Sequence, residues 1–170
     1  MVPYDRLVEI RDDQLVLRPI AAGDAADIAT GLAEPETSRY MLQIPTPYTL
    51  EHALVWVERC EQVWREGTSC PFAIVDAATG AFLGSIELSV DSGSIGYWVA
   101  PGAQGRGVAT RALRLLCGWA RRRPLRLTTH PGNVASQRVA EKAGFQRVGT
   151  ITEVSPFRDG ERESILFELS

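Results

Sequence analysis

Apolar side chains recur at the spacing of an amphipathic helix in several stretches of the chain. In the second half, the i, i+3, i+4, i+7, i+8, i+11 spacing is filled by Ala109, Ala112, Leu113, Leu116, Cys117 and Ala120. The same spacing predicts a helix over residues 50–66, and Gly67 is placed to end it in the left-handed conformation. Two shorter helices are predicted over residues 21–32 and 134–143, the second with Asn133 as its N-cap and Gly144 closing it.

Alternating or short apolar runs bounded by turn residues predict the strands. These strands span residues 14–18, 72–76, 82–89, 94–99, 125–129, 145–151 and 164–169. Residues 34–49 contain three prolines and are predicted as a loop or a broken helix. Hairpins and helical crossovers alternate in this order, which predicts a mixed α/β (α+β) fold. We expect residues 1–170 to form one domain, with a single, mostly antiparallel twisted sheet of six to seven strands and helices on both faces.

The composition, with 45% hydrophobic and 23% charged residues, is typical of a soluble globular domain. No apolar run approaches the ~20 residues of a membrane helix, and residues 1–13 lack the apolar core of a signal peptide. We therefore expect a cytoplasmic protein with no membrane association. The three cysteines and two histidines match no metal-ligand spacing, so no metal site is expected.

The net charge of −3 conceals an asymmetry between the two halves of the chain. Residues 1–94 carry fifteen acids and six arginines, which gives −9, whereas residues 95–170 carry six acids and twelve bases, which gives +6. This bias is either an ordinary solvated surface or a basic half for an anionic ligand and an acidic half for a cationic one. Nucleic acid is disfavoured, because the pI is near 5.5 and the one arginine run, 121–123, suits a helix C-terminus.

A glycine-rich turn, residues 101–109 (PGAQGRGVA), separates the strand at 94–99 from the long second-half helix. A strand, such a turn and a helix N-terminus form an anion site, because free N–H groups face the ligand. No lysine follows these glycines as in a nucleotide-binding P-loop, and Thr110 stands where a dinucleotide motif needs its third glycine. The turn is therefore either a plain tight connection or an anion-binding turn of another kind.

The turn and a later segment together resemble a known superfamily. Residues 104–109 (QGRGVA) resemble the Q/R-x-x-G-x-G/A signature of the GNAT superfamily of N-acetyltransferases, and residues 133–145 (NVASQRVAEKAGF) resemble its second motif. The spelling is closest to the RimJ/RimL-type branch, and the similarity covers about residues 14–169. The resemblance implies a GNAT fold, acetyl-CoA as co-substrate and direct transfer of acetyl to a primary amine in a ternary complex.

The resemblance also implies a set of donor-binding residues. The backbone N–H groups of the turn would bind the pyrophosphate; this set is Gln104, Gly105, Arg106, Gly107, Val108, Ala109 and Thr110. The backbone of Tyr97, Trp98 and Val99 would pair with pantetheine like another strand, and an N–H near Val99 would hold the thioester carbonyl. Asn133 and Ser136 would reach the same arm, although Asn133 serves equally well as a helix cap. Arg138 and Lys142 either contact the phosphates of CoA or lie on a solvated helix face.

The residues that would move protons are less conventional. Many relatives place a tyrosine seven residues after the motif asparagine, where this chain has Ala140. The resemblance suggests Ser136 as the acid for the leaving thiolate, although its position also suits a second cap or a solvent-facing first-turn residue. Glu87 lies on the polar face of the strand at 82–89, so it is the base if that face lines the cleft and an outward-facing glutamate otherwise. Arg111 stands where the branch often has an acidic residue.

The acceptor stays open at this level. A lysine amine of pKa ~10.4 costs about 4.6 kcal/mol to neutralise at pH 7 and an α-amine of pKa ~7.8 about 1 kcal/mol, which favours weakly basic amines. The walls of the acceptor site are expected to come from residues 34–49, 50–66 and 152–162, which supply Tyr40, Tyr48, Trp56, Phe157, Glu34, Glu36 and Glu153. A protein N-terminus, a polyamine, an amino acid and an aminoglycoside remain possible, as does a monomer or a homodimer. The alternatives are a non-catalytic acyl-CoA-binding sensor or assembly module, or a transferase of another acyl group.

Overall fold

The computed structural model describes residues 8–121 and 123–170, so Arg122 of the arginine run and the first seven residues lie outside the description. Within these ranges the strands are β1 (Ile10–Arg11), β2 (Leu15–Pro19), β3 (Ser69–Asp76), β4 (Phe82–Ser89), β5 (Ile95–Val99), β6 (Leu125–Thr129), β7 (Gln146–Val154) and β8 (Glu161–Leu169). The helices are α1 (Ala25–Ala33), α2 (Pro35–Ser38), α3 (Leu50–Glu66), α4 (Val108–Trp119) and α5 (Val134–Lys142).

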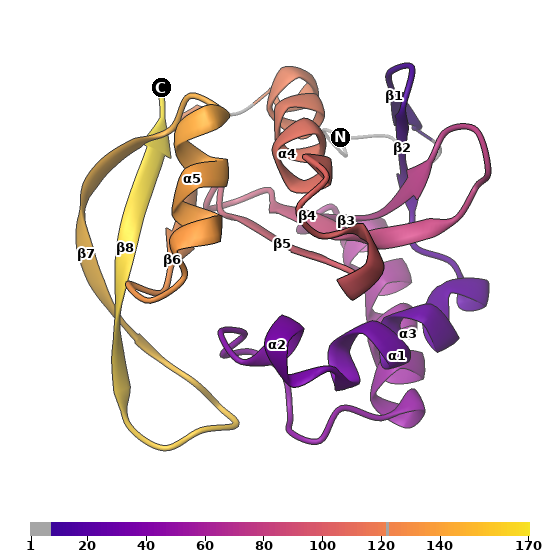
Figure 1. The fold of residues 1–170 in the computed structure, drawn as a ribbon, viewed down its shortest axis with the longest axis horizontal. Coiled ribbons are helices and arrows are strands. Elements are labelled where there is room, and N and C mark those ends of the chain that lie inside the picture. The colour runs from indigo at the N-terminus through magenta and orange to yellow at the C-terminus, as the bar shows by residue number, and fades with distance from the viewer. Residues whose placement is uncertain (1–7, 122) are drawn as a thin grey trace.

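The strands form two antiparallel sheets that meet at one point. The first has the order β1-β2-β3-β4-β5 and the second the order β6-β8-β7. Among the described residues, one parallel bridge between Ser94 and Arg126 joins them, where the Arg126 N–H donates to the Gly93 carbonyl at 2.9 Å. Beyond this bridge β5 and β6 run apart (Figure 1). The mixed α/β class is confirmed, with eight strands in two joined sheets where six or seven in one sheet were expected.

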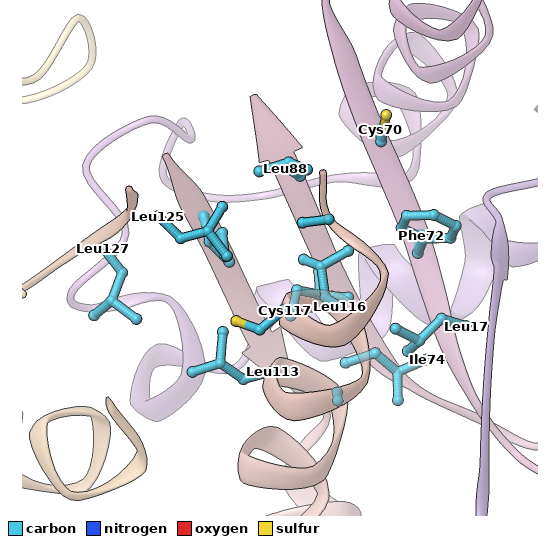
Figure 2. Packing of buried hydrophobic residues seen from close by; sticks show 14 of the residues in the cluster. Leu17, Cys70, Phe72, Ile74, Leu88, Leu113, Leu116, Cys117, Leu125 and Leu127 are labelled. Atoms are coloured by element: carbon cyan, nitrogen blue, oxygen red, sulfur yellow. The ribbon is translucent and has the colours of Figure 1, made fainter. Parts of the chain in front are cut away.

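Each face of the larger sheet carries its own hydrophobic core. One cluster lies between the sheet and α4 and includes the fully buried Leu17, Phe72, Leu113 and Leu116 (Figure 2). The second cluster lies on the opposite face under α1 and α3. All three cysteines are free and buried, and Cys117 packs as a small hydrophobic residue, as predicted. Helices therefore cover both faces of the larger sheet, and the gap between β5 and β6 lies at its β5 edge.

Local signals set several boundaries correctly. Helix α3 spans the predicted residues 50–66; the Thr49 hydroxyl accepts from the His52 N–H at 3.3 Å, and Gly67 ends the helix at φ 70°. Strand β3 begins at Ser69, three residues before the predicted start, and so contains Pro71. There β3 pairs only with β4, because β2 ends at Pro19, and a proline is tolerated in such a local edge.

Candidate active site

The glycine-rich turn has the conformation that an anion site requires. Gly105 and Gly107 have φ angles of 72° and 77°, in the left-handed region that disfavours side chains. A Cβ added at either position would find no heavy atom within 4 Å, so the space above the turn is open. Helix α4 begins at Val108, and the first N–H groups of a helix have no carbonyl partner within it. These amides and the positive end of the helix dipole lie beside this open space.

Side chains on and near the turn are used for the structure around it. The Gln104 amide donates to the Val99 carbonyl at 3.0 Å and so ties the turn to the end of β5. Arg111, on the first turns of α4, lies 3.3 Å from Asp12 and 3.0 Å from Asp13 and holds the β1–β2 turn against the helix. The residue at the position where the branch often has an acid therefore makes ion pairs within this structure.

Strand β5 presents part of its backbone to the gap between the sheets. The Ser89 N–H donates to the Ser94 carbonyl and the Ala100 N–H to the Leu83 carbonyl, both at 2.8 Å. Hydrogen-bonded and non-hydrogen-bonded pairs alternate in an antiparallel ladder.

This alternation separates Trp98 from Tyr97 and Val99, the three β5 residues expected to pair with pantetheine. Trp98, opposite Ser85, bonds toward β4, and its side chain is buried in the α3-side core. It therefore has no backbone group to offer the donor. The N–H and C=O groups of Tyr97 and Val99 point the other way, toward the gap.

A cavity of about 640 Å³ opens at this gap, and its walls come from both faces of the sheet. Glu87 lines it from the α3 side, because its neighbours Ile86 and Leu88 point into the α4-side core. Tyr97 and Ser136 line it from the α5 side. Opposite Glu87 on β5 stands Gly96, where an added Cβ would meet no atom within 4 Å. The cavity thus connects a carboxylate on one side of the sheet with two hydroxyls on the other.

Glu87 lines the cleft, so its side chain is not directed outward into bulk solvent. The Ser69 hydroxyl contacts Glu87 Oε1 and lies 3.1 Å from the Leu88 carbonyl oxygen. Burial raises the pKa of the Glu87 carboxyl above its ordinary value of 4.5, while the Ser69 hydrogen bond and the Arg59 charge act in the opposite direction. Neither Ser69 nor Arg59 was found from the sequence, because only the strand register and the α3 packing bring them to Glu87.

Ser136 lies on the first turn of α5, with its backbone held in place. The Asn133 side chain accepts from the Ser136 N–H at 3.1 Å, so the predicted N-cap is confirmed. The Ser136 Oγ lies 2.8 Å from the hydroxyl of Tyr97, whose side chain the sequence did not single out. Ala140, where many relatives carry tyrosine, is fully buried in the core. Arg138 is exposed on α5.

Segment 38–44 runs from the last residue of α2 into the connection to α3 and covers one side of the cavity. The Tyr40 hydroxyl donates at 3.1 Å to the carbonyl of Gly132, which lies on the β6–α5 loop. The guanidinium of Arg158, on the β7–β8 loop, donates to the Ser38 carbonyl at 3.1 Å. Segment 38–44 therefore bridges the two sides of the cleft. Sequence patterns predicted the wall but not these contacts, which join residues about ninety or more positions apart in the chain.

Within residues 8–121 and 123–170, no group of three His, Cys, Asp or Glu side chains is placed to hold a metal ion. None of the helices described there has the length and apolarity needed to cross a membrane.

Known proteins share the sequence family and the fold. Residues 14–146 match the family model for the acetyltransferase (GNAT) domain. The probable N-acetyltransferase YjcK of Bacillus subtilis (strain 168) is 23% identical over 154 residues, which cover 82% of this chain and 84% of that protein.

Two solved structures are similar over nearly their whole length. One is a putative ribosomal-protein-serine acetyltransferase from Vibrio cholerae, with a TM-score of 0.81, 19% identity and coverage of 98% of this chain and 99% of the other. The other is RimL, a ribosomal L7/L12 alpha-N-protein acetyltransferase in complex with coenzyme A, with a TM-score of 0.78, 17% identity and coverage of 95% and 97%. The family match covers well over half of the chain, including both motifs that the sequence pointed to. The chain therefore belongs to the GNAT acetyltransferase family and is an N-acetyltransferase.

Proposed function

We propose that this enzyme transfers the acetyl group of acetyl-CoA directly to a weakly basic primary amine, with Glu87 as general base and Ser136 as general acid. The observation that carries the proposal is the cavity at the gap between β5 and β6, which Glu87 and Ser136 line from opposite faces of the sheet. An amine that enters from the α3 side meets a carboxylate, and a thioester on the α5 side meets a hydroxyl.

The donor half of the proposal uses the turn and the free edge of β5. The N–H groups from Gly105 to Thr110 bind the pyrophosphate, because they carry partial positive charge and face open space. The gap-facing N–H and C=O groups of Tyr97 pair with the pantetheine amides, as an added strand would. The Val99 N–H then donates to the thioester oxygen, where negative charge develops during attack.

The acceptor half starts from a neutral amine. Its nitrogen attacks the thioester carbonyl carbon, and Glu87 takes the proton that the nitrogen loses, directly or through water. The tetrahedral intermediate collapses with cleavage of the C–S bond, and the sulfur takes a proton from Ser136 Oγ. Because burial raises the pKa of Glu87, it is a better base than an exposed glutamate but a weak one for a lysine amine.

This weakness favours an α-amine as acceptor. Deprotonation at pH 7 costs about 1 kcal/mol for an α-amine and about 4.6 kcal/mol for lysine. The names of the two solved structures, one a ribosomal-protein-serine acetyltransferase and the other an alpha-N-protein acetyltransferase, support the same class. The aromatic wall residues Tyr48 and Trp56 and the carboxylates Glu87 and Glu153 give the cavity an apolar lining with negative charge, which suits an amine on an apolar body.

An assay of free thiol release from acetyl-CoA tests the proposal. The panel contains short peptides with a free α-amine, the same peptides with a blocked N-terminus and a free lysine, a polyamine, and a reaction without amine. We expect release above the amine-free rate with free α-amine peptides and at least tenfold slower release with lysine-only peptides. Binding of acetyl-CoA with no amine-dependent release from any member would instead support a non-catalytic acyl-CoA-binding module.

A further inference from the structure

The phenol of Tyr97 meets the hydroxyl of Ser136 across the gap between the two sheets. The two oxygens are 2.8 Å apart, although the residues are 39 positions apart in the sequence and lie on β5 and α5. The Tyr97 oxygen also lies 3.4 Å from the Ser136 carbonyl. Both side chains line the cavity. The contact therefore lies where the proposed function needs the proton donor for the leaving thiolate.

The hydrogen bonds around Ser136 determine where its hydroxyl hydrogen can point. The backbone N–H of Ser136 donates to the Asn133 side chain, which fixes the main chain of this first turn of α5. Among the described residues, Tyr97 is the one hydrogen-bond partner of Ser136 Oγ. A serine hydroxyl has one hydrogen to donate and two lone pairs to accept with. When Tyr97 donates to Ser136, the serine hydrogen is free to point into the cavity; when Ser136 donates to Tyr97, that hydrogen is occupied.

Tyr97 is suited to be the donor of the pair. Burial raises the pKa of its phenol above the ordinary 10.0, with the Ser136 hydrogen bond acting in the opposite direction. The phenol therefore carries its hydrogen throughout the neutral range. Its ring packs against the α4-side core, which fixes its direction toward α5.

We propose that Tyr97 is a positioning residue that orients the Ser136 hydroxyl toward the leaving sulfur and restores its proton. The assignment rests on the proposed function, which gives Ser136 the role of acid. As the C–S bond breaks, the sulfur keeps the electron pair and takes the Ser136 proton, and the Ser136 oxygen takes the phenolic proton of Tyr97. Water then returns a proton to the phenolate. The acetyl group is transferred to the amine nitrogen as an amide, and CoA leaves as the neutral thiol.

Three variants test this relay: Tyr97→Phe, Ser136→Ala and the double variant. Thiol release with an α-amine peptide gives kcat, and titration calorimetry gives the Kd for acetyl-CoA. We expect Tyr97→Phe to lower kcat by about tenfold to a hundredfold and to leave Kd within about twofold, because general acid–base contributions are of that order or larger. The double variant is expected to be no slower than Ser136→Ala alone, because both changes interrupt one proton path.

A change of leaving group separates proton delivery from a merely structural role. The probes are two acetyl thioesters without the nucleotide, one of N-acetylcysteamine and one of 4-nitrothiophenol. The nitrothiophenolate is stable as an anion at neutral pH and needs no acid. We expect the Tyr97→Phe defect to be large with the first thioester and nearly absent with the second, whereas a structural defect lowers both rates equally.

The outcomes that overturn the assignment are distinct from those that overturn the function. Unchanged kcat in Tyr97→Phe, equal losses with both thioesters, or additive losses in the double variant remove Tyr97 from the relay while wild-type transfer stands. Ser136→Thr keeps a hydroxyl, so it is expected to retain the sensitivity to Tyr97→Phe, and loss of that sensitivity contradicts the relay. Absence of amine-dependent thiol release from the wild-type enzyme overturns the proposed function and this assignment with it.

Discussion

Introducing a carboxylate side chain at position 107 should weaken the binding of acetyl-CoA through the charge of that side chain alone. Gly107 stands immediately before α4 with φ 77°, and a side chain there would point into open space beside the first amides of the helix. Gly107→Asp places a negative charge where the pyrophosphate is proposed to bind. Gly107→Asn has the same shape without the charge, and asparagine and aspartate both tolerate the left-handed conformation. The comparison of the two variants therefore isolates electrostatics from backbone strain.

The size of the effect follows from Coulomb's law. Each of two phosphate charges about 6 Å from the carboxylate repels it by about 0.7 kcal/mol in a water-like dielectric, and together they give about 1.4 kcal/mol, or tenfold in Kd. The site is exposed, since Gly105, Arg106 and Gly107 all lie at the surface, so the high dielectric is appropriate. Salt reduces this repulsion, because the Debye length falls from about 10 Å at 0.1 M to about 3 Å at 1 M.

Titration calorimetry with acetyl-CoA at low salt and at about 1 M salt measures this difference. We expect the Asp variant to bind about tenfold more weakly than the Asn variant at low salt, and the ratio to fall toward one at high salt. Equal affinities of the two variants at low salt would refute the reasoning, because the pyrophosphate would then lie away from the N-terminus of α4.

Three further predictions concern the acceptor side and the core. Burial raises the pKa of Glu87, so protonation of this carboxylate should lower the wild-type kcat/KM as the pH falls, at a pH above the ordinary glutamate pKa of 4.5. In Glu87→Gln, the pH profile of kcat/KM should lose this limb and keep the limb set by the acceptor amine. Gly96→Leu should fold normally, because φ at Gly96 is outside the left-handed region, but its side chain should fill the space opposite Glu87. We expect kcat/KM for the amine to fall at least tenfold while the Kd for acetyl-CoA stays unchanged. Unchanged amine kinetics would contradict the proposal that the amine reaches Glu87 through this space. Leu113→Ala, at a fully buried position under α4, should lower the free energy of unfolding by about 2–5 kcal/mol in urea denaturation, and a loss below 1 kcal/mol would contradict the packing described.

The local structure of the proposed donor site was largely determined by local sequence. The seventeen consecutive residues from Ile95 to Arg111 contain strand β5, the two glycines with positive φ and the first turn of the amphipathic helix α4. The helix start, the turn and the capping of Ser136 by Asn133 depend on neighbours within a few residues. For that reason, residue spacing alone located the turn and the boundaries of α3, β4 and β6.

The proposed acceptor site and the proposed proton path depend on contacts that only the tertiary structure brings together. Strand register sets Ser69 against Glu87, and the divergence of β5 from β6 opens the cavity. Tyr97 meets Ser136 because its side chain reaches across that gap, from β5 to the first turn of α5. These contacts join segments far apart in the chain, and the free energy that holds them comes from burial shared over two cores. Hydrophobic periodicity reports which face of an element is buried, but not which distant side chain it will meet.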